Sequence, residues 1–353
     1  MNGASNLEFF DRFGLDAINW VVAHRPDEEA GEFYDPLQGP LGFLEARRIS
    51  TSAWRVFWEE IPGQELPTIR YRFVTPKGEL TTVLQSNEHT TWITEHLIKK
   101  PSDIDLIGEF ATAPKCDVAA VNREAAAFGE RGLTRGHMPC FDVYGQPGAW
   151  QDAACLVGIE PLIMATYDDP AWVHELLRIL LRNKLIYARS LKGAAFDLVE
   201  HGGGDASSTV ISPRIFDEFV APYDTQIIAA VHEAGQRLVY HTCGGMMPLL
   251  ERIAAMGPDA METFTPAGLG GDVDLREAKR RIGAKVCMIG GLDQLHSFVN
   301  CTPEQTRAEV RRCFAEAGVG GGYILSPSDH FFDADLKLLE AFSDEARRCE
   351  YHQ

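Results

Sequence analysis

The chain has 353 residues, of which 45% are hydrophobic and 24% charged, proportions typical of a globular protein with a substantial core. Its formal net charge of −18 opposes the phosphate contacts that dominate nucleic-acid binding, so nucleic acid is excluded as a partner. No apolar run approaches the roughly 20 residues of a membrane span, and residues 1–12 lack the pattern of a secretory signal. We therefore expect a cytoplasmic protein without a membrane partner.

The first half of the chain shows fewer regular patterns than the second. Residues 17–24 and 133–138 have the composition of strands, and residues 69–84 alternate around Thr-Pro-Lys-Gly like a β-hairpin. We interpret residues 1–130 as containing an N-terminal elaboration, made of a hairpin and helices, of a single domain that spans residues 1–353. The eight cysteines show no paired spacing, which indicates reduced thiols.

From residue 170 onward the chain repeats one pattern, in which a helical stretch and a glycine precede a short apolar run that ends on polar or glycine residues. Pro170, Pro213 and Pro303 each stand at the expected first position of a helix. The predicted helices are 170–187, 213–234, 249–256, 275–282, 303–317 and one from about 335, and the predicted strands are 195–199, 237–240, 260–264, 285–289 and 322–325.

Five successive strand and helix units require a parallel sheet whose faces are covered, which is either a closed barrel or a doubly wound open sheet. Polar clusters follow almost every predicted strand, as expected where all the loops after the strands converge on one rim. No Gly-x-Gly-x-x-Gly follows a first strand. The sequence therefore predicts an α/β fold of the (β/α)8 TIM-barrel class.

His241 and Cys243 are the most specific candidates for chemistry at this rim. Residues two apart in a strand point to the same side, so an imidazole and a thiolate can be directed at one point. That pair suits zinc, and a catalytic zinc has about three protein ligands beside an open position. Asp329 or His330, after the last strand, is the preferred source of a third ligand, and Glu200 is the next choice. We assign Asp329 to the metal, and Glu200 and His330 to acid–base catalysis.

Four segments resemble the uroporphyrinogen decarboxylase superfamily, most firmly from about residue 156 onward. They are Ile211-Ser-Pro-Arg-Ile-Phe-Asp-Glu-Phe-Val-Ala-Pro-Tyr223, His241-Thr-Cys-Gly244, Gly290-Gly-Leu-Asp293 and Gly321-Gly-Tyr-Ile-Leu325. The resemblance implies a (β/α)8 barrel. The superfamily divides into decarboxylases of the haem pathway and corrinoid-linked methyltransferases, and the Arg-Gln-Ala-Gly-Arg-Tyr motif of the decarboxylases is absent here.

The methyltransferase branch, by resemblance, binds zinc with a His-x-Cys pair and a further Cys on the last strand. It moves a methyl group between a substrate and the cobalt of a separate corrinoid protein. This chain has Ser328-Asp329-His330 where that branch has the further Cys. An oxygen ligand in place of a thiolate makes zinc a stronger Lewis acid, which favours an ether oxygen as leaving group over a thiol nucleophile. Phe331 and Phe332 can wall an aromatic substrate.

The expected function is thus zinc-dependent transfer of a methyl group from a methoxylated aromatic compound to cob(I)alamin on a corrinoid protein, as the component of an O-demethylase. The alternatives are transfer from a methylcorrinoid to a thiol, a metal-free decarboxylase-like lyase, and a binding or scaffold protein in which His241 is only hydrogen-bonded. The expected partners are a corrinoid protein, a small-molecule methyl donor or acceptor, and a second copy of the chain in a homodimer.

Overall fold

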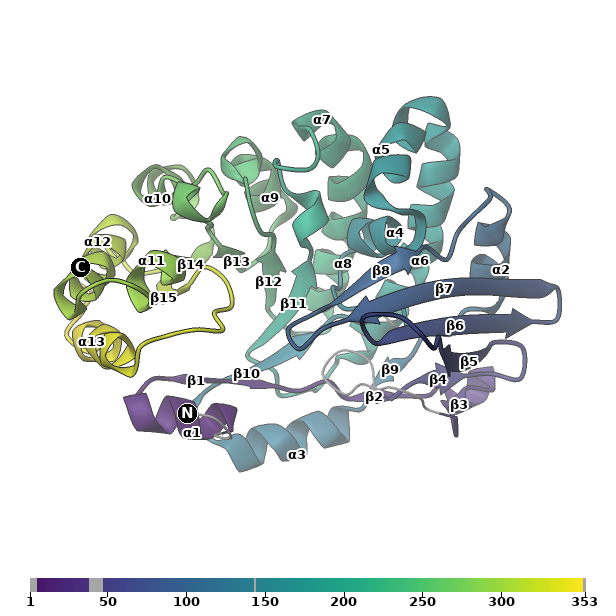
Figure 1. The fold of residues 1–353 in the computed structure, drawn as a ribbon, viewed down its shortest axis with the longest axis horizontal. Coiled ribbons are helices and arrows are strands. Elements are labelled where there is room, and N and C mark those ends of the chain that lie inside the picture. Colours follow the sequence, from purple (N-terminus) through teal and green to yellow (C-terminus); the bar gives the residue numbers. More distant parts are fainter. Residues whose placement is uncertain (1–4, 38–46, 143, 352–353) are drawn as a thin grey trace.

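The computed structural model describes residues 5–37, 47–142 and 144–351, and its centre is a sheet of seven parallel strands. The strand order follows the chain, β1-β10-β11-β12-β13-β14-β15, and Figure 1 shows the sheet curled with helices around it. The strands are β1 (Ala17–Trp20), β10 (Gly132–His137), β11 (Leu198–Gly202), β12 (Leu238–His241), β13 (Ala260–Thr263), β14 (Cys287–Leu292) and β15 (Tyr323–Pro327). This arrangement confirms the predicted TIM-barrel class.

Helices connect the strands because each parallel connection must cross back over the sheet. These helices are α3 (Val118–Phe128), α4 (Ala149–Val157), α5 (Ile159–Asp168), α6 (Pro170–Ser190), α7 (Pro213–Ile215), α8 (Ala221–Glu233), α9 (Leu250–Met256), α10 (Leu275–Ile282), α11 (Gln294–Phe298) and α12 (Pro303–Ala317). A π-helical turn, Phe216–Val220, joins α7 to α8 just before Pro222, which has no backbone N–H to donate. Helices α1 (Asn6–Phe13) and α13 (Leu336–Ala346) contact each other at one end of the molecule.

The predicted hairpin lies in a four-stranded antiparallel sheet within the N-terminal elaboration. Its strands are β5 (Arg55–Glu60), β6 (Thr68–Thr75), β7 (Gly78–Ser86) and β8 (Thr91–Glu95), and the turn between β6 and β7 is the predicted one. Two short antiparallel pairs and one helix complete this region: β2 (His24–Arg25) with β9 (Lys115–Cys116), β3 (Phe33–Tyr34) with β4 (Ile49–Ser50), and α2 (Asp103–Phe110).

Alternation along the strands divides their side chains between two environments. Tyr240, Met261 and Met288 join the main core, while Val239, Ala260 and Ile289 form a separate cluster from alternate positions of the same strands. The carboxyl ends of all seven strands meet at one rim, since the strands are parallel. Across the described parts of the chain, no helix is long and apolar enough to cross a membrane.

Candidate metal centre

His241 stands at the end of β12 and is held on both sides of its ring. Its Nδ1 lies 2.7 Å from Glu262 Oε1, and its Nε2 lies 3.1 Å from Cys243 Sγ. Glu262 is opposite His241 in the register of β12 and β13. The sequence therefore brings an imidazole, a thiol and a carboxylate together at the rim, and the predicted proximity of His241 and Cys243 is observed.

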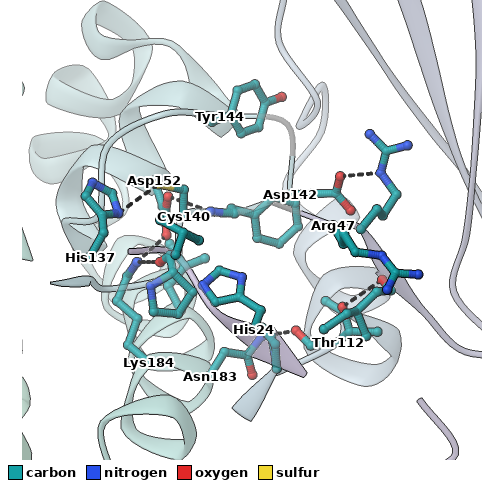
Figure 2. Close-up of a pocket in the computed structure, with 18 of the residues that line it drawn as sticks. His24, Arg47, Thr112, His137, Cys140, Asp142, Tyr144, Asp152, Asn183 and Lys184 are labelled. Atoms are coloured by element: carbon teal, nitrogen blue, oxygen red, sulfur yellow. Dashed lines mark hydrogen bonds and ion pairs between the residues drawn. The ribbon is translucent and has the colours of Figure 1, made fainter. Parts of the chain in front are cut away.

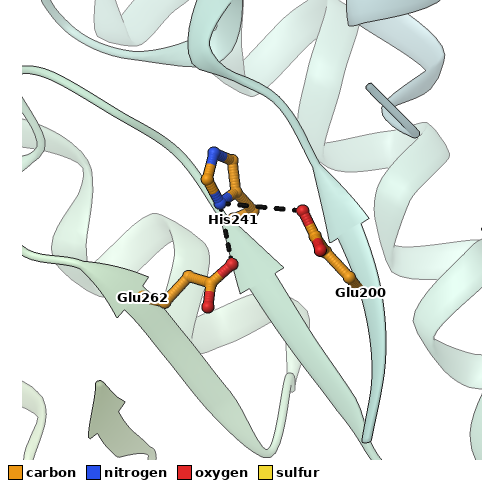
Figure 3. A group of neighbouring side chains, drawn as sticks. All are labelled: Glu200, His241 and Glu262. Carbon is orange, nitrogen blue, oxygen red and sulfur yellow. Dashed lines mark hydrogen bonds and ion pairs between the residues drawn. The ribbon is translucent and has the colours of Figure 1, made fainter. Parts of the chain in front are cut away.

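Glu200, on β11, approaches the same ring, with its Oε1 3.7 Å from His241 Nδ1 (Figure 3). Within the described residues, Glu200, His241 and Glu262 are the one set of three metal-capable side chains whose ligand atoms all lie within 4.8 Å of one another. All three come from neighbouring parallel strands, which explains why residues far apart in the sequence meet here.

Arg135, on β10, joins the two carboxylates beneath the imidazole. It donates to Glu262 Oε2 and Glu200 Oε2 at 2.8 Å each, and it also contacts Glu262 Oε1. Its guanidinium lies over the Trp20 ring, 4.3 Å from the centroid. Arg135 and both glutamates are buried, so a single guanidinium holds the two carboxyl groups in place in the barrel interior.

The ionisation of His241 and Glu262 follows from these contacts. Burial disfavours charge on His241, but the hydrogen bonds to Cys243 and Glu262 and the charge of Glu200 outweigh it, so the pKa of His241 lies well above its usual value. Burial likewise raises the pKa of Glu262, but the charge of Arg135 and the hydrogen bond to His241 lower it by more. The cluster thus favours a carboxylate on the Nδ1 side of the ring.

Backbone contacts fix the turn that carries Cys243. Gly244 has φ +83°, and a Cβ there would lie 2.8 Å from Thr209 Oγ1, so glycine allows the chain to turn away directly after the cysteine. Thr263 has φ +80°, a strained value for a β-branched residue, and its hydroxyl donates to the Thr242 carbonyl at 2.6 Å. The turns after β12 and β13 are therefore fastened to each other beside the site.

Asp329 and His330 occupy a different setting from the one that the sequence suggested. Both are exposed in the loop after β15, the His330 N–H donates to Asp329 Oδ1, and neither belongs to the cluster around His241. The preceding Ser328 is buried, and its hydroxyl lies 3.0 Å from the Leu292 carbonyl and 3.1 Å from Gln294 Oε1. Phe331 packs against Phe298, away from the cluster, whereas Phe332 is exposed.

Sequence reasoning missed Arg135 and Glu262. A signal for Glu262 was available, because a carboxylate in the middle of the predicted strand 260–264 needs a polar partner if that strand is buried. Arg135 lies inside a predicted strand, where a charged residue indicates either an exposed face or a buried partner. Its partners Glu200 and Glu262 are 65 and 127 residues away, and no local pattern reveals them.

A cavity of about 100 Å³ lies between the end of β10 and the N-terminal elaboration (Figure 2), and the residues of the His241 cluster are not among those that line it. His137 lines it and is opposite Glu200 in the register of β10 and β11. The loop after β10 forms one wall, held by Lys184, whose Nζ donates to the Pro139 carbonyl at 2.8 Å and pairs with the Asp152 carboxylate at 2.6 Å. The loop after β10 is thus held in a fixed position between the end of that strand and the N-terminal elaboration.

His24 also lines this cavity and provides a pH-dependent test of its burial. Its Nε2 is buried without a hydrogen-bond partner among the described residues, and burial, helped by the charge of His137, lowers the pKa of His24 to about 4. Between pH 6.5 and about 4 the unfolded chain takes up a proton that the folded ring resists. The free energy of unfolding should therefore decrease as the pH is lowered through this window, by up to about 1.4 kcal/mol per pH unit for this group.

The His24→Phe variant should lose that contribution while keeping the ring contact with Tyr187. Urea unfolding at several pH values from 7 to 4 gives the free energy of unfolding of both proteins. The difference between the two values at each pH isolates His24, because the other groups titrate in both proteins alike. Parallel curves for the two proteins would show that His24 is not held neutral by the fold.

The sequence is similar to that of a known protein family. The family model described as "Uroporphyrinogen decarboxylase (URO-D)" matches residues 138–349. Uroporphyrinogen decarboxylases of Psychromonas ingrahamii and Shewanella loihica are 29% identical over 205 residues and 28% identical over 242 residues. These matches cover 54% and 65% of this chain but only 53% and 64% of the two relatives.

One structural neighbour carries a different name from the sequence relatives. A solved structure titled "methyltransferase from Methanosarcina mazei" superposes with a TM-score of 0.56 at 16% identity, and the match covers 74% of this chain and 72% of that one. At such low identity the likeness shows a shared fold.

Proposed function

The chain belongs to the uroporphyrinogen decarboxylase family, and from this premise we propose that it is a zinc-dependent methyltransferase. It takes a methyl group from a methoxylated aromatic compound and delivers it to cob(I)alamin on a separate corrinoid protein. The observation that carries this proposal is the arrangement of the His241 ring, with a carboxylate at Nδ1 and a thiol at Nε2.

This arrangement fits zinc on the Nε2 side of His241. A histidine ligand characteristically donates its other ring N–H to a carboxylate, which fixes the tautomer and raises the basicity of the ligating nitrogen. Glu262 is placed for that role, and Cys243 supplies a thiolate next to Nε2. An ion on the Nδ1 side is less favourable, because Arg135 already occupies both carboxylates and would repel a second cation.

We propose the loop after β15 as the source of the third ligand. The carboxyl ends of β12 and β15 lie on the same rim, and the Ser328 contacts to Leu292 and Gln294 fix the start of that loop there. Asp329 remains our candidate ligand, with His330 as an acid–base group. No second cysteine joins His241 and Cys243 within the described residues, which supports an oxygen-containing ligand set.

Zinc bound here would act as a Lewis acid on the ether oxygen. In the net reaction the C–O bond of the methyl ether breaks, the electron pair of cobalt(I) forms the bond to the methyl group, and the departing oxygen takes a proton. Glu200 is the acid–base candidate in the cluster, because Arg135 binds its Oε2 while its Oε1 faces the His241 ring. The other side chains of the cluster, Arg135 and Glu262, position His241 and Cys243.

The names of the curated relatives favour a second candidate, decarboxylation of a tetrapyrrole. One observation weighs against it. The Arg-Gln-Ala-Gly-Arg-Tyr motif that the resemblance associates with the decarboxylases is absent from this sequence.

One panel of reactions separates these functions. The purified protein, loaded with zinc, is mixed with cob(I)alamin and a series of methoxylated benzoates and phenols, and the absorbance of methylcobalamin is followed. Methylcobalamin formation with an ether supports the proposal. Methyl transfer from methylcobalamin to thiols alone would assign the protein to the reverse reaction, and decarboxylation of uroporphyrinogen by the zinc-free protein would contradict the proposal.

Glu262→Gln should weaken zinc binding by roughly 10- to 100-fold, because an amide orients and polarises the imidazole less well than a carboxylate. Zinc affinity is measured by competition with a chromogenic chelator. Glu277→Gln is the control, since Glu277 lies on the surface of α10, where it forms an ion pair with Arg280. Equal zinc affinity in the wild type and the Glu262→Gln variant would contradict a role for the carboxylate in the metal site.

A further inference from the structure

A second and larger cavity, of about 830 Å³, lies at the unclosed side of the barrel. In the described parts of the chain β1 and β15 are the two edges of the parallel sheet, and both line this cavity. Figure 1 shows α1 and α13 at the same end of the molecule, and residues of both helices form its outer wall. Its volume lies in the range of about 300–1,000 Å³ that is usual for small-molecule sites.

The walls of this cavity are apolar and rich in aromatic rings. Ile324 of β15 is 37% exposed although it lies in the central sheet, and Leu133 and Leu198 of the inner strands also border the space. On the helical side, Phe9 packs against Phe331, and both line the cavity. Such surface normally packs against other side chains in a barrel interior, so its exposure favours an apolar occupant.

Arg135 supplies the polar contact at the inner end. Its side chain is 7% exposed and lines the cavity, and its two Nη atoms bind Glu200 and Glu262. Its Nε, in contrast, is buried without a hydrogen-bond partner among the described residues. A buried unpaired donor costs free energy, which a ligand oxygen would recover once a small movement of the Arg135 side chain turns Nε toward the cavity.

The charges around Arg135 select the ligand class. Two carboxylates already surround the guanidinium, so a third anion would add uncompensated negative charge in a buried setting. Asp16 and Glu130, which also line the cavity, oppose an anion further, and Arg347, the other cation of the lining, already pairs with Asp344 at 2.8 Å. A ligand with several carboxylates is excluded by the same argument, and a neutral acceptor such as a hydroxyl or carbonyl oxygen is favoured.

We propose that this cavity is a second ligand site, which takes a neutral aromatic molecule whose oxygen accepts a hydrogen bond from Arg135 Nε. The site does not depend on the proposed methyl transfer. Arg135 also binds Glu200 and Glu262. A molecule in the cavity therefore contacts the residue that supports the His241 cluster.

Calorimetric titration with 2-naphthol at pH 7, where this probe is neutral, tests the proposal. We expect saturable binding of one molecule per chain. Naphthalene, which lacks the oxygen, should bind about 2- to 12-fold more weakly, the factor that one net hydrogen bond contributes. Leu133→Trp and Ile324→Trp place an indole in the cavity and should each weaken binding by at least about tenfold, because a filled site excludes the probe.

Val319→Trp is the matched control, since Val319 is 65% exposed and does not line the cavity. Thermal unfolding verifies that each variant is folded, and Ile324→Trp is the safer variant because its site already opens to the cavity. The absence of saturable binding to the wild type, or equal affinity in Ile324→Trp and Val319→Trp, overturns the proposed site. Equal affinity for naphthalene and 2-naphthol overturns the role of Arg135.

Discussion

Replacement of Cys243 by serine is expected to remove bound zinc and, with it, methyl transfer. Cys243 is one of the two proposed zinc ligands at the end of β12, and a serine hydroxyl is a much poorer zinc ligand at neutral pH. The loss of zinc affinity should exceed the roughly 10- to 100-fold that removal of an outer hydrogen-bond partner causes. Zinc content after dialysis against a chelator measures the effect without any assay of activity.

Cys301→Ser provides the matched control for that experiment. Cys301 is also half-buried, but its thiol donates to the Ser297 carbonyl, a contact that a serine hydroxyl can reproduce. This variant should retain stoichiometric zinc and the rate of methylcobalamin formation. Full retention of zinc by Cys243→Ser would rule out Cys243 as a ligand and would leave the Glu200, His241 and Glu262 group as the metal site.

The second half of the fold was predictable because its signals are local. The helix predicted over 275–282 is observed as Leu275–Ile282, where Asp274 accepts from the Glu277 N–H and Gly283 follows the last turn. Where a signal depends on residues distant in the sequence, the predicted bounds differ from the observed ones. The sequence predicts a strand over 195–199 that ends before the polar Glu200, whereas the observed strand is Leu198–Gly202. Glu200 lies within the strand, and its charge is buried against Arg135 from β10.

The residues of the candidate site also differ in how far they can be predicted, because some contacts are local in the sequence and others are distant. His241 and Cys243 meet as their spacing predicts, but β12 ends at His241, so Cys243 reaches the imidazole from the following turn and not from the strand. Glu262 joins them only through the register of β12 and β13, which a single sequence does not specify. The loop with Asp329 and His330 leaves the last strand, and the buried hydrogen bonds of Ser328 are what determine its start.

Arg135→Met is expected to destabilise the fold more than any other single change considered above. It leaves two buried carboxylates beside each other without a counter-charge, and breaking a buried ion pair on one side costs about 3–5 kcal/mol. Urea unfolding at pH 7 measures this loss. Arg70→Met is the control, because the Arg70 pair with Glu59 is exposed and contributes at most about 1 kcal/mol.

The cause of that loss can be tested by removing the charges that Arg135 balances. If the cost arises from uncompensated carboxylates, adding Glu200→Gln and Glu262→Gln to Arg135→Met should recover at least half of the lost free energy of unfolding, since amides are neutral when buried. The triple variant should still fail to bind zinc tightly, because the carboxylate at His241 Nδ1 is gone. A triple variant as unstable as Arg135→Met alone would instead attribute the loss to the packing of Arg135 against Trp20.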